Sequence, residues 1–261
     1  MNLINKILVP IDFSDSSMNA FQYALNLIDS DNSIQLILLN VIDNDENSME
    51  MMEVLSQFDV LKNQVPKYVN HLEIVVKHGS RIDTIVETTM EMNPKLVVMG
   101  TKGKSKSLMH AESNTSLLVK KLDRSVLVIP QDYSRYAIKE IAVAIDQQID
   151  DASDLALVHD LAKWFNAKVH VLTVCKNKEE AVSMGKQVES TLEYYLDTLD
   201  HTYELSNDTD IVHGIEQYID KNAIDMLAIL PKTHAKNSEP SGGKLTRVLT
   251  LQSKIPLLIA D

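Results

Sequence analysis

The sequence contains one cysteine, Cys175, among its 261 residues. A single thiol cannot form a disulfide within the chain or supply the paired cysteines of a CxxC metal site, so we expect a reducing compartment. Basic residues are outnumbered: 25 Lys and Arg stand against 37 Asp and Glu, and the net charge is −12. Nucleic acids and anionic membranes are poor partners for such a chain because both need clustered positive charge. We therefore expect small-molecule or protein partners.

Long apolar runs and the common catalytic motifs are also missing. No apolar stretch approaches the length of a membrane span. The N-terminal "NKILVPID" reaches Asp12 after a short apolar run. This pattern favours a first strand over a signal peptide, so we expect a cytoplasmic location. The patterns GxSxG, HExxH and Walker A are absent. His170 and Cys175 make a poor metal pair because residues five apart in a strand point to opposite faces. We expect no enzyme activity and no metal requirement.

An internal repeat organises the chain. Hydrophobic residues make up 44% of the sequence and charged residues 24%, a composition typical of globular domains. The segment "KILVPID" at 6–12 is echoed by "EIAVAID" at 140–146, and four further pairs follow in the same order: 36–43 with 169–176, 77–87 with 212–220, 95–100 with 226–231, and 124–130 with 254–260. We predict two copies of one domain, at 1–132 and 139–261, with a short polar linker between them.

Apolar β-branched runs alternate with longer segments of helical period in each copy. In the first copy this pattern predicts strands near 6–12, 35–42, 72–77, 95–100 and 125–130, and helices near 16–29, 49–69, 80–93 and 113–122. The predicted fold class is α/β, with two tandem doubly wound domains that each contain a five-stranded parallel sheet. Ligands bind such sheets beyond the carboxyl ends of the strands, where the strand order reverses.

Carboxylates follow the first strand of each copy, Asp12 in the first and Asp146 in the second. An ionised Asp at this place can accept hydrogen bonds from ribose hydroxyls. Asp12 could instead begin a helix cap together with Ser14 and Asp15, and the spacing leaves both interpretations open.

The segment "MGTKGKSKSLMHAESNT" at 99–115 follows the fourth strand. Gly100 and Gly103 let the backbone fold tightly round a ligand, although any tight turn uses glycine as well. Ser113, Asn114 and Thr115 begin the next helix. Their hydroxyls and the free N–H groups there suit a phosphate, and they equally suit an ordinary helix cap.

With these segments the chain resembles a tandem universal stress protein. The resemblance rests on "KILVPIDFSDSSMNAFQYAL", on "KHG" after the third strand, and on "VVMGTKG" followed by "SNTSLLVKKLDRSVLVIP". ATP-binding members of that family carry G-x-x-G, nine residues, and then G-S or G-T. Here the spacer is one residue short and Glu112 stands at the expected glycine; strict spacing would place Ser113 there instead. The resemblance also implies a fold like that of the adenine nucleotide alpha hydrolases, with the two halves packed through their last strands as a pseudo-dimer.

Carried over to this sequence, the resemblance implies a nucleotide site in the N-terminal half. Asp12 would face the ribose, and the backbone of Val41 would meet the adenine. The remaining expected ligand residues are Pro10, Met99, Gly100 and Gly103 near the ribose and α-phosphate, Ser113, Asn114 and Thr115 at the outer phosphates, and Lys102, with Lys104 and Lys106 as further cations in the same loop. Glu112 would repel the phosphates, so we expect weak binding of ATP or AMP.

The second copy departs further from the family pattern. Pro231 and His234 stand where Gly100 and Gly103 stand in the first copy, and proline has no N–H to offer a phosphate. We expect this half to have a structural or protein-binding role. The leading interpretation is a non-enzymatic, stress-associated regulator. The alternatives are a protein-interaction module with both sites inactive, and a slow ATPase or self-phosphorylating protein, which lacks an evident activating base.

Overall fold

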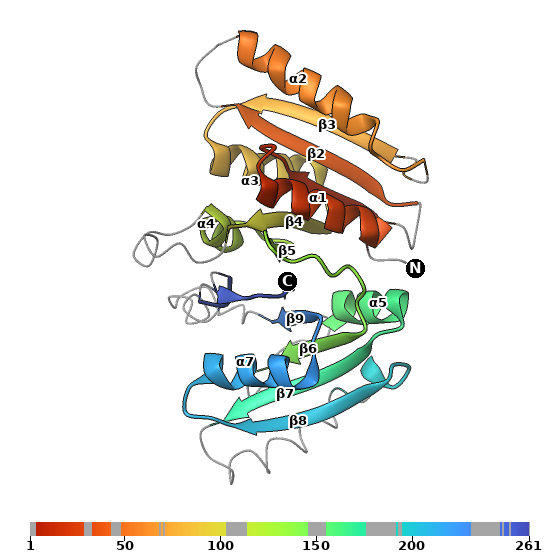
Figure 1. The fold of residues 1–261 in the computed structure, drawn as a ribbon, viewed down its shortest axis with the longest axis vertical. Coiled ribbons are helices and arrows are strands. Elements are labelled where there is room, and N and C mark those ends of the chain that lie inside the picture. The colour runs from red at the N-terminus through yellow and green to blue at the C-terminus, as the bar shows by residue number, and fades with distance from the viewer. Residues whose placement is uncertain are drawn as a thin grey trace. The chain divides into compact units, whose positions relative to one another are not determined.

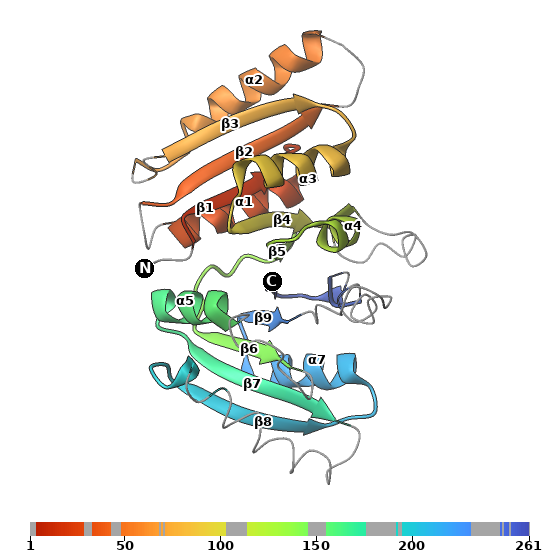
Figure 2. The ribbon, with the colours of Figure 1, turned by 180° about the vertical axis from the view of Figure 1, so that it is seen from behind.

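A computed structural model describes residues 4–28, 33–42, 48–67, 69, 71–102, 114–145, 155–175, 192, 195–230, 246, 248–250 and 252–260. The chain divides into two compact units, Met1–Ser134 and Arg135–Asp261. Each unit contains five parallel strands with helices in the connections between them (Figures 1 and 2), which confirms the predicted α/β fold class.

The first unit is a doubly wound sheet with its strand order reversed at the centre. Its elements are β1 (Lys6–Pro10), α1 (Asp15–Ile28), β2 (Gln35–Ile42), α2 (Ser48–Lys62), β3 (His71–His78), α3 (Arg81–Met92), β4 (Leu96–Thr101), α4 (Asn114–Lys121) and β5 (Ser125–Pro130). The strands lie in the order β3-β2-β1-β4-β5. Helices α1 and α2 cover one face, and α3 and α4 cover the other (Figures 1 and 2). The chain therefore leaves β1 in one direction along the sheet and returns on its other side at β4, which makes this the switch point where ligands bind.

Strands of continuous apolar sequence form the core of this unit. Ile7, Leu8 and Val9 of β1 are fully buried, as are Leu96, Val97 and Val98 of β4, because helices cover both faces of the sheet. The elements match the sequence-based expectations closely, with one clear exception. Helix α2 ends at Lys62 instead of continuing to 69, since Pro66 cannot continue a helix and disfavours helical geometry at the residue before it.

The second unit repeats the strand order of the first. Its elements are β6 (Glu140–Ala144), α5 (Ala156–Phe165), β7 (Lys168–Cys175), β8 (His201–Asn207), α7 (Ile211–Asn222), β9 (Met226–Ile229) and β10 (Leu257–Ile259). The order is β10-β9-β6-β7-β8, with parallel pairing throughout.

One pairing of the sequence repeat is wrong in detail. The "HG" at 78–79 was aligned with the "HG" at 213–214, but His78 is the last residue of β3, whereas His213 lies in the first turn of α7. The residue that precedes α7 is Asp210, whose carboxylate accepts hydrogen bonds from the backbone N–H groups of Val212 and His213. Ser80 precedes α3 and makes no such side-chain cap. The match of letters therefore does not reflect equivalent positions.

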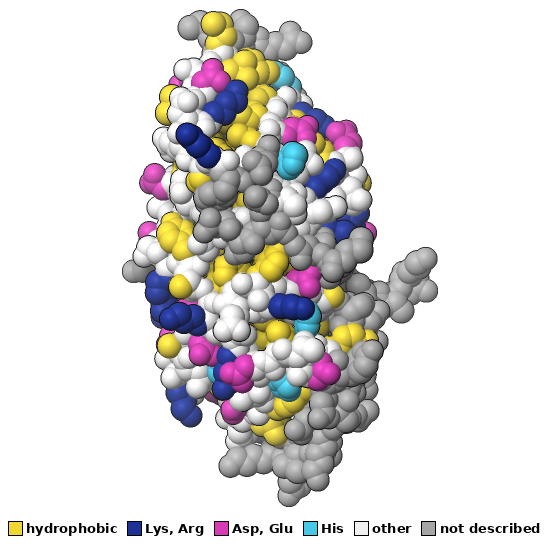
Figure 3. Space-filling view, turned by 90° about the vertical axis from the view of Figure 1, so that its right-hand side faces the viewer, with side chains coloured by type: hydrophobic (Ala, Val, Ile, Leu, Met, Phe, Trp, Pro, Cys, Tyr) yellow, Lys and Arg dark blue, Asp and Glu magenta, His cyan; other side chains and the backbone are white. Residues whose placement is uncertain are grey.

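Several sequence-based expectations fall outside the described residues: Gly103, Lys104, Lys106, Glu112, Ser113, Asp146, Pro231 and His234. The packing of the two halves as a pseudo-dimer also stays a prediction. Of the helices that the structure describes, none is long and apolar enough to cross a membrane. On the face drawn in Figure 3, Lys and Arg side chains are interspersed with Asp and Glu.

Candidate functional site

A solvent-open cavity of about 190 Å³ lies at the carboxyl ends of β1 and β4 in the first unit. Ligand pockets for drug-sized molecules commonly measure about 300–1,000 Å³. The part of the cavity that the described residues line is smaller than this. Seven of the expected ligand residues line this cavity: Pro10, Asp12, Val41, Met99, Gly100, Lys102 and Thr115.

The other three expected residues differ in what can be said of them. Gly103 and Ser113 lie outside the described residues, and Asn114 is the first residue of α4 with its side chain outside the description. The apolar part of the lining includes Ile11, Leu39, Ile82, Ile85 and Leu118. This combination of an apolar wall with a few polar groups is typical of small-molecule sites.

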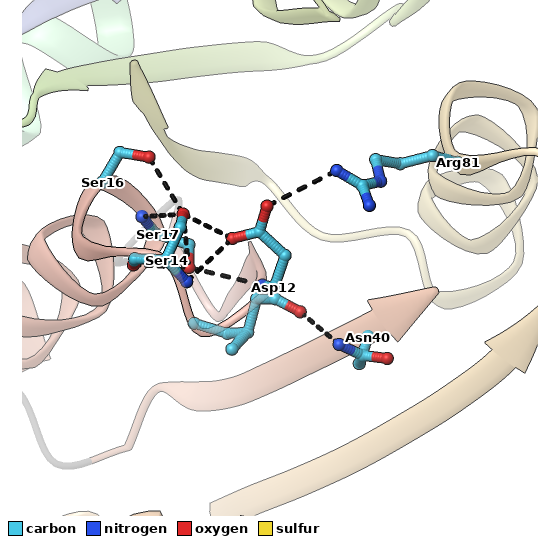
Figure 4. Close-up of polar contacts among 7 residues, drawn as sticks. Asp12, Ser14, Ser16, Ser17, Asn40 and Arg81 are labelled. Carbon is cyan, nitrogen blue, oxygen red and sulfur yellow. Dashed lines mark hydrogen bonds and ion pairs between the residues drawn. The ribbon is translucent and has the colours of Figure 1, made fainter. Parts of the chain in front are cut away.

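Asp12 lies just beyond β1 and connects the strand to α1 (Figure 4). Its Oδ1 accepts hydrogen bonds from the backbone N–H of Ser14 at 3.1 Å and from the Ser14 hydroxyl at 2.5 Å. Ser14 Oγ in turn accepts from the N–H of Ser17 at 3.4 Å, within the first turn of α1. Asp12 therefore takes part in the helix-start structure that one of the two sequence interpretations expected. Asp12 also lines the cavity, so its Oδ2 can accept a hydrogen bond from a ribose hydroxyl, as the other interpretation expected.

The carboxyl group of Asp12 is held in its ionised form. Partial burial acts to raise its pKa, but hydrogen bonds from Ser14 and Ser17 and the positive charge of Arg81 outweigh burial, and the pKa lies below its ordinary value. The group is consequently a hydrogen-bond acceptor at neutral pH and a weak general base. It suits the recognition of hydroxyl groups better than proton abstraction.

Arg81 is a cavity residue that sequence reasoning missed. It is the first residue of α3, and its Nη1 lies 3.4 Å from Asp12 Oδ2 (Figure 4). Both side chains are 44% exposed, and ion pairs this exposed contribute only about 0–1 kcal/mol. The segment "KHGSRID" gives a helix start and no sign of this contact, because the two residues are 69 positions apart.

Gly100 has a structural role that its expected ligand role did not include. A Cβ atom built at this position would lie 1.9 Å from the backbone oxygen of Ser16 and 3.0 Å from the backbone nitrogen of Ser17. Strand β4 thus passes directly against the first turn of α1, at a distance that only glycine permits. The glycine of the sequence motif is explained by this packing without reference to a ligand.

Helix N-termini converge on the cavity. Ser16 and Ser17 come from the first turn of α1, Arg81 and Ile82 from the first turn of α3, and Thr115 from the first turn of α4. A helix start presents backbone N–H groups and the positive end of a helix dipole, both of which favour an anion, although the N–H of Ser17 in α1 already donates to Ser14 Oγ. Among the described residues of the lining, the ionisable ones are Asp12, Arg81 and Lys102, which together carry a net charge of +1 in a chain of net charge −12.

Asn40 is a second residue that the sequence did not identify. It lies inside the apolar run of β2 and is 5% exposed. Its Nδ2 donates to the carbonyl oxygen of Ile11 at 2.7 Å (Figure 4). This bond fixes the backbone immediately before Asp12. A polar residue within an otherwise apolar strand was the available signal.

His170 and Cys175, which their spacing in the sequence makes a poor metal pair, each form hydrogen bonds with other residues. His170 Nδ1 lies 2.8 Å from the Tyr218 hydroxyl, and His170 Nε2 lies 2.6 Å from Glu140 Oε2. Burial, followed by the charges of Glu204 and Glu140, raises the pKa of Tyr218 to about 12. The phenol therefore stays protonated, and its hydroxyl shares a hydrogen bond with His170 Nδ1. Both ring nitrogens are engaged, and the Cys175 thiol donates to the carbonyl oxygen of Ser206 instead.

The sequence of the first unit is similar to a known protein family. Residues 4–130 match the model of the universal stress protein family. No curated protein matches the chain. A universal stress protein from Archaeoglobus fulgidus has a similar structure, with a TM-score of 0.76 at 13% identity over 99% of both chains. A functionally unknown protein from Pseudomonas aeruginosa has a TM-score of 0.66 at 15% identity over 99% of this chain and 93% of its own.

Shorter structures match about half of the chain. One is a universal stress protein family protein from Arabidopsis thaliana with AMP bound, which covers 48% of this chain and 91% of its own at 20% identity, with a TM-score of 0.38. The full-length matches show the shared fold of the whole chain, and the family model identifies the unit that contains the cavity. The match to the universal stress protein family model covers residues 4–130, and the described residues of the cavity lie within that range.

Proposed function

We propose that the first unit binds an adenine nucleotide weakly in the cavity beyond β1 and β4, and that the chain is a non-enzymatic, stress-associated regulatory protein. The observation that carries this proposal is the ionised carboxylate of Asp12 at the wall of a cavity lined by three helix starts. A nucleotide combines ribose hydroxyls, which suit a carboxylate, with phosphates, which suit helix N-termini and cations.

The size of the cavity supports separate places for the base and for the phosphates of the nucleotide. Its apolar lining near Leu39 and Val41 suits the flat base of the nucleotide. The volume of about 190 Å³ leaves the phosphates at the open side, toward Lys102 and Thr115. Since the first phosphate is the one nearest the cavity, AMP makes most of the contacts that the described residues offer.

Glu112 is the reason to expect weak binding of ATP. It stands in the sequence where ATP-binding relatives have glycine. A carboxylate about 4 Å from a phosphate charge costs roughly 1 kcal/mol in water and roughly 4 kcal/mol at an effective dielectric constant of 20. The second figure corresponds to a loss of affinity of several hundredfold and the first to about fivefold. AMP and adenosine should be penalised less because they lack the outer phosphates.

A protein-interaction module with both sites inactive is the second candidate. It is favoured by the exposed apolar side chains of α2, where Met52 is 72% exposed and Val60 is 59% exposed. An ATPase or self-phosphorylating activity has less support, because the weak basicity of Asp12 supplies no activating base among the described lining residues.

Mass spectrometry of the gently purified chain tests the proposal without assuming a ligand. We expect an adenine nucleotide at less than one equivalent, with more retained by Glu112→Gly than by the wild type. The interaction-module alternative predicts no nucleotide in either protein, even after incubation with millimolar AMP and ATP. Release of phosphate from ATP, absent in Asp12→Asn, would instead support the enzyme.

A further inference from the structure

Arg81 places a positive charge in the cavity, next to the carboxylate of Asp12. Its guanidinium lies 3.4 Å from Asp12 Oδ2 and lines the same cavity. The acidic residue that the proposed function assigns to ribose hydroxyls is therefore already paired with a cation. A ligand that uses Asp12 must share or displace this contact.

The neighbouring acid on α3 does not compete for Arg81. Asp83 Oδ1 accepts a hydrogen bond from Lys121 Nζ at 2.7 Å, and Asp83 Oδ2 accepts one from Ser80 Oγ at 3.0 Å. These two contacts lower the pKa of Asp83. Asp83 is thus paired with Lys121 on α4, and Arg81 is paired with Asp12.

Little free energy is needed for Arg81 to exchange its ion-pair partner. The ion pair with Asp12 is long, at 3.4 Å, and both side chains are 44% exposed, so breaking it costs little. A phosphate offers the planar guanidinium a stronger, two-pronged contact than a single carboxylate oxygen does. The start of α3 adds N–H groups without a side-chain cap from Ser80, and these also favour an anion.

We propose that Arg81 makes this cavity select phosphorylated nucleosides over free nucleosides, by exchanging its ion pair with Asp12 for one with the phosphate nearest the ribose. This inference rests on the proposed function. In the unliganded chain Arg81 neutralises Asp12. In the complex the hydroxyls of the ligand donate to Asp12 and the phosphate pairs with Arg81, so each charged side chain keeps a polar partner. A free nucleoside lacks the phosphate and leaves Arg81 in competition for Asp12.

The exchange predicts effects of opposite sign for two ligands. With Arg81→Gln, adenosine should bind as well as to the wild type or a few times more tightly, because Asp12 no longer has a competing cation. AMP should bind about tenfold more weakly, since one charge-assisted contact is lost. Arg124→Gln is the matched control: it removes one positive charge from the same unit, at a residue that contacts Asp123 and Asn93 and does not line the cavity.

Titration calorimetry of the full chain with adenosine and AMP at low and high salt measures these affinities. We expect the preference for AMP to fall about tenfold in Arg81→Gln and to be retained in Arg124→Gln. High salt should reduce this preference less in Arg81→Gln than in the wild type. Arg81→Lys keeps the positive charge and loses the planar guanidinium, so its preference for AMP should lie between those of the wild type and Arg81→Gln. Equal losses for adenosine and AMP, or no change in either, would overturn the role of Arg81 and leave the nucleotide site standing. Failure of the wild type to bind either compound would overturn both proposals.

Discussion

Replacement of Gly100 by alanine separates two explanations of the glycine near the end of β4. The added Cβ would lie 1.9 Å from the backbone oxygen of Ser16, whereas Cβ atoms essentially never approach closer than 3.0 Å. The strand and the start of α1 must therefore separate by about 1.1 Å. The obstacle is backbone, so no side-chain rotation relieves it. Helix α1 carries buried Ala20, Phe21 and Ala24 and cannot move without disturbing the core.

Overpacking of this kind costs about 1–3 kcal/mol, and backbone displacement places Gly100→Ala at the upper end. With a typical urea dependence of about 1–3 kcal/mol per molar, the midpoint of unfolding should fall by about 1–2 M. Circular dichroism during urea titration measures this shift.

The matched control for Gly100→Ala is Gly214→Ala. Its Cβ would meet the Val174 side chain at 2.7 Å, and alanine favours the surrounding helix by about 0.8–1 kcal/mol. We expect a net change below about 1 kcal/mol in the control, because the two effects oppose each other. An unchanged midpoint in Gly100→Ala, combined with lost nucleotide binding, would show that the glycine serves close approach of a ligand and would refute the packing argument.

Three further predictions concern other residues. Glu112→Gly should tighten ATP binding more than adenosine binding in calorimetry, with a gain that shrinks as salt screens the charge; equal gains for both ligands would remove Glu112 as the cause of weak binding. His170→Leu should lower the free energy of unfolding by about 1–3 kcal/mol, because Glu140 and Tyr218 lose their buried partner, and Tyr218→Phe by only about 0.5–1.5 kcal/mol; a smaller effect of His170→Leu would contradict the assigned network. Because the pKa of Asp12 is lowered, its carboxylate should stabilise the fold above pH 3.8, the ordinary pKa, and should lose this effect as the pH falls below that value. The difference in the free energy of unfolding between wild type and Asp12→Asn should therefore disappear in acid. A difference that persists in acid would show that the pKa is not lowered.

The fold of the first unit could be predicted from sequence because each strand is an apolar run between turn residues. Strand β2 occupies Gln35–Ile42 as expected, and β5 occupies Ser125–Pro130. Errors arose where local pattern and chain geometry disagree. The helical period continues past Lys62, but Pro66 ends the helix. The apolar run continues to Ile11, but β1 ends at Pro10.

The site could be predicted only in the parts that local sequence encodes. Asp12 follows β1, Gly100 lies near the end of β4, and Thr115 is in the first turn of α4. The topology rule brings such positions together. Arg81 could not be found because its significance lies in a contact with Asp12 across the cavity, and nothing near it in the sequence specifies that contact. The packing role of Gly100 was hidden for the same reason, since it depends on where α1 begins.

Calorimetric titration of the full chain with AMP, in the wild type and in Asp12→Asn, tests the central claim most directly. The account predicts saturable binding at one site in the wild type, and an affinity about tenfold or more lower in Asp12→Asn, because a charged hydrogen-bond acceptor for the ribose becomes neutral. The absence of saturable binding by the wild type at millimolar AMP, or an equal affinity in Asp12→Asn, would contradict a nucleotide site at the carboxyl ends of β1 and β4.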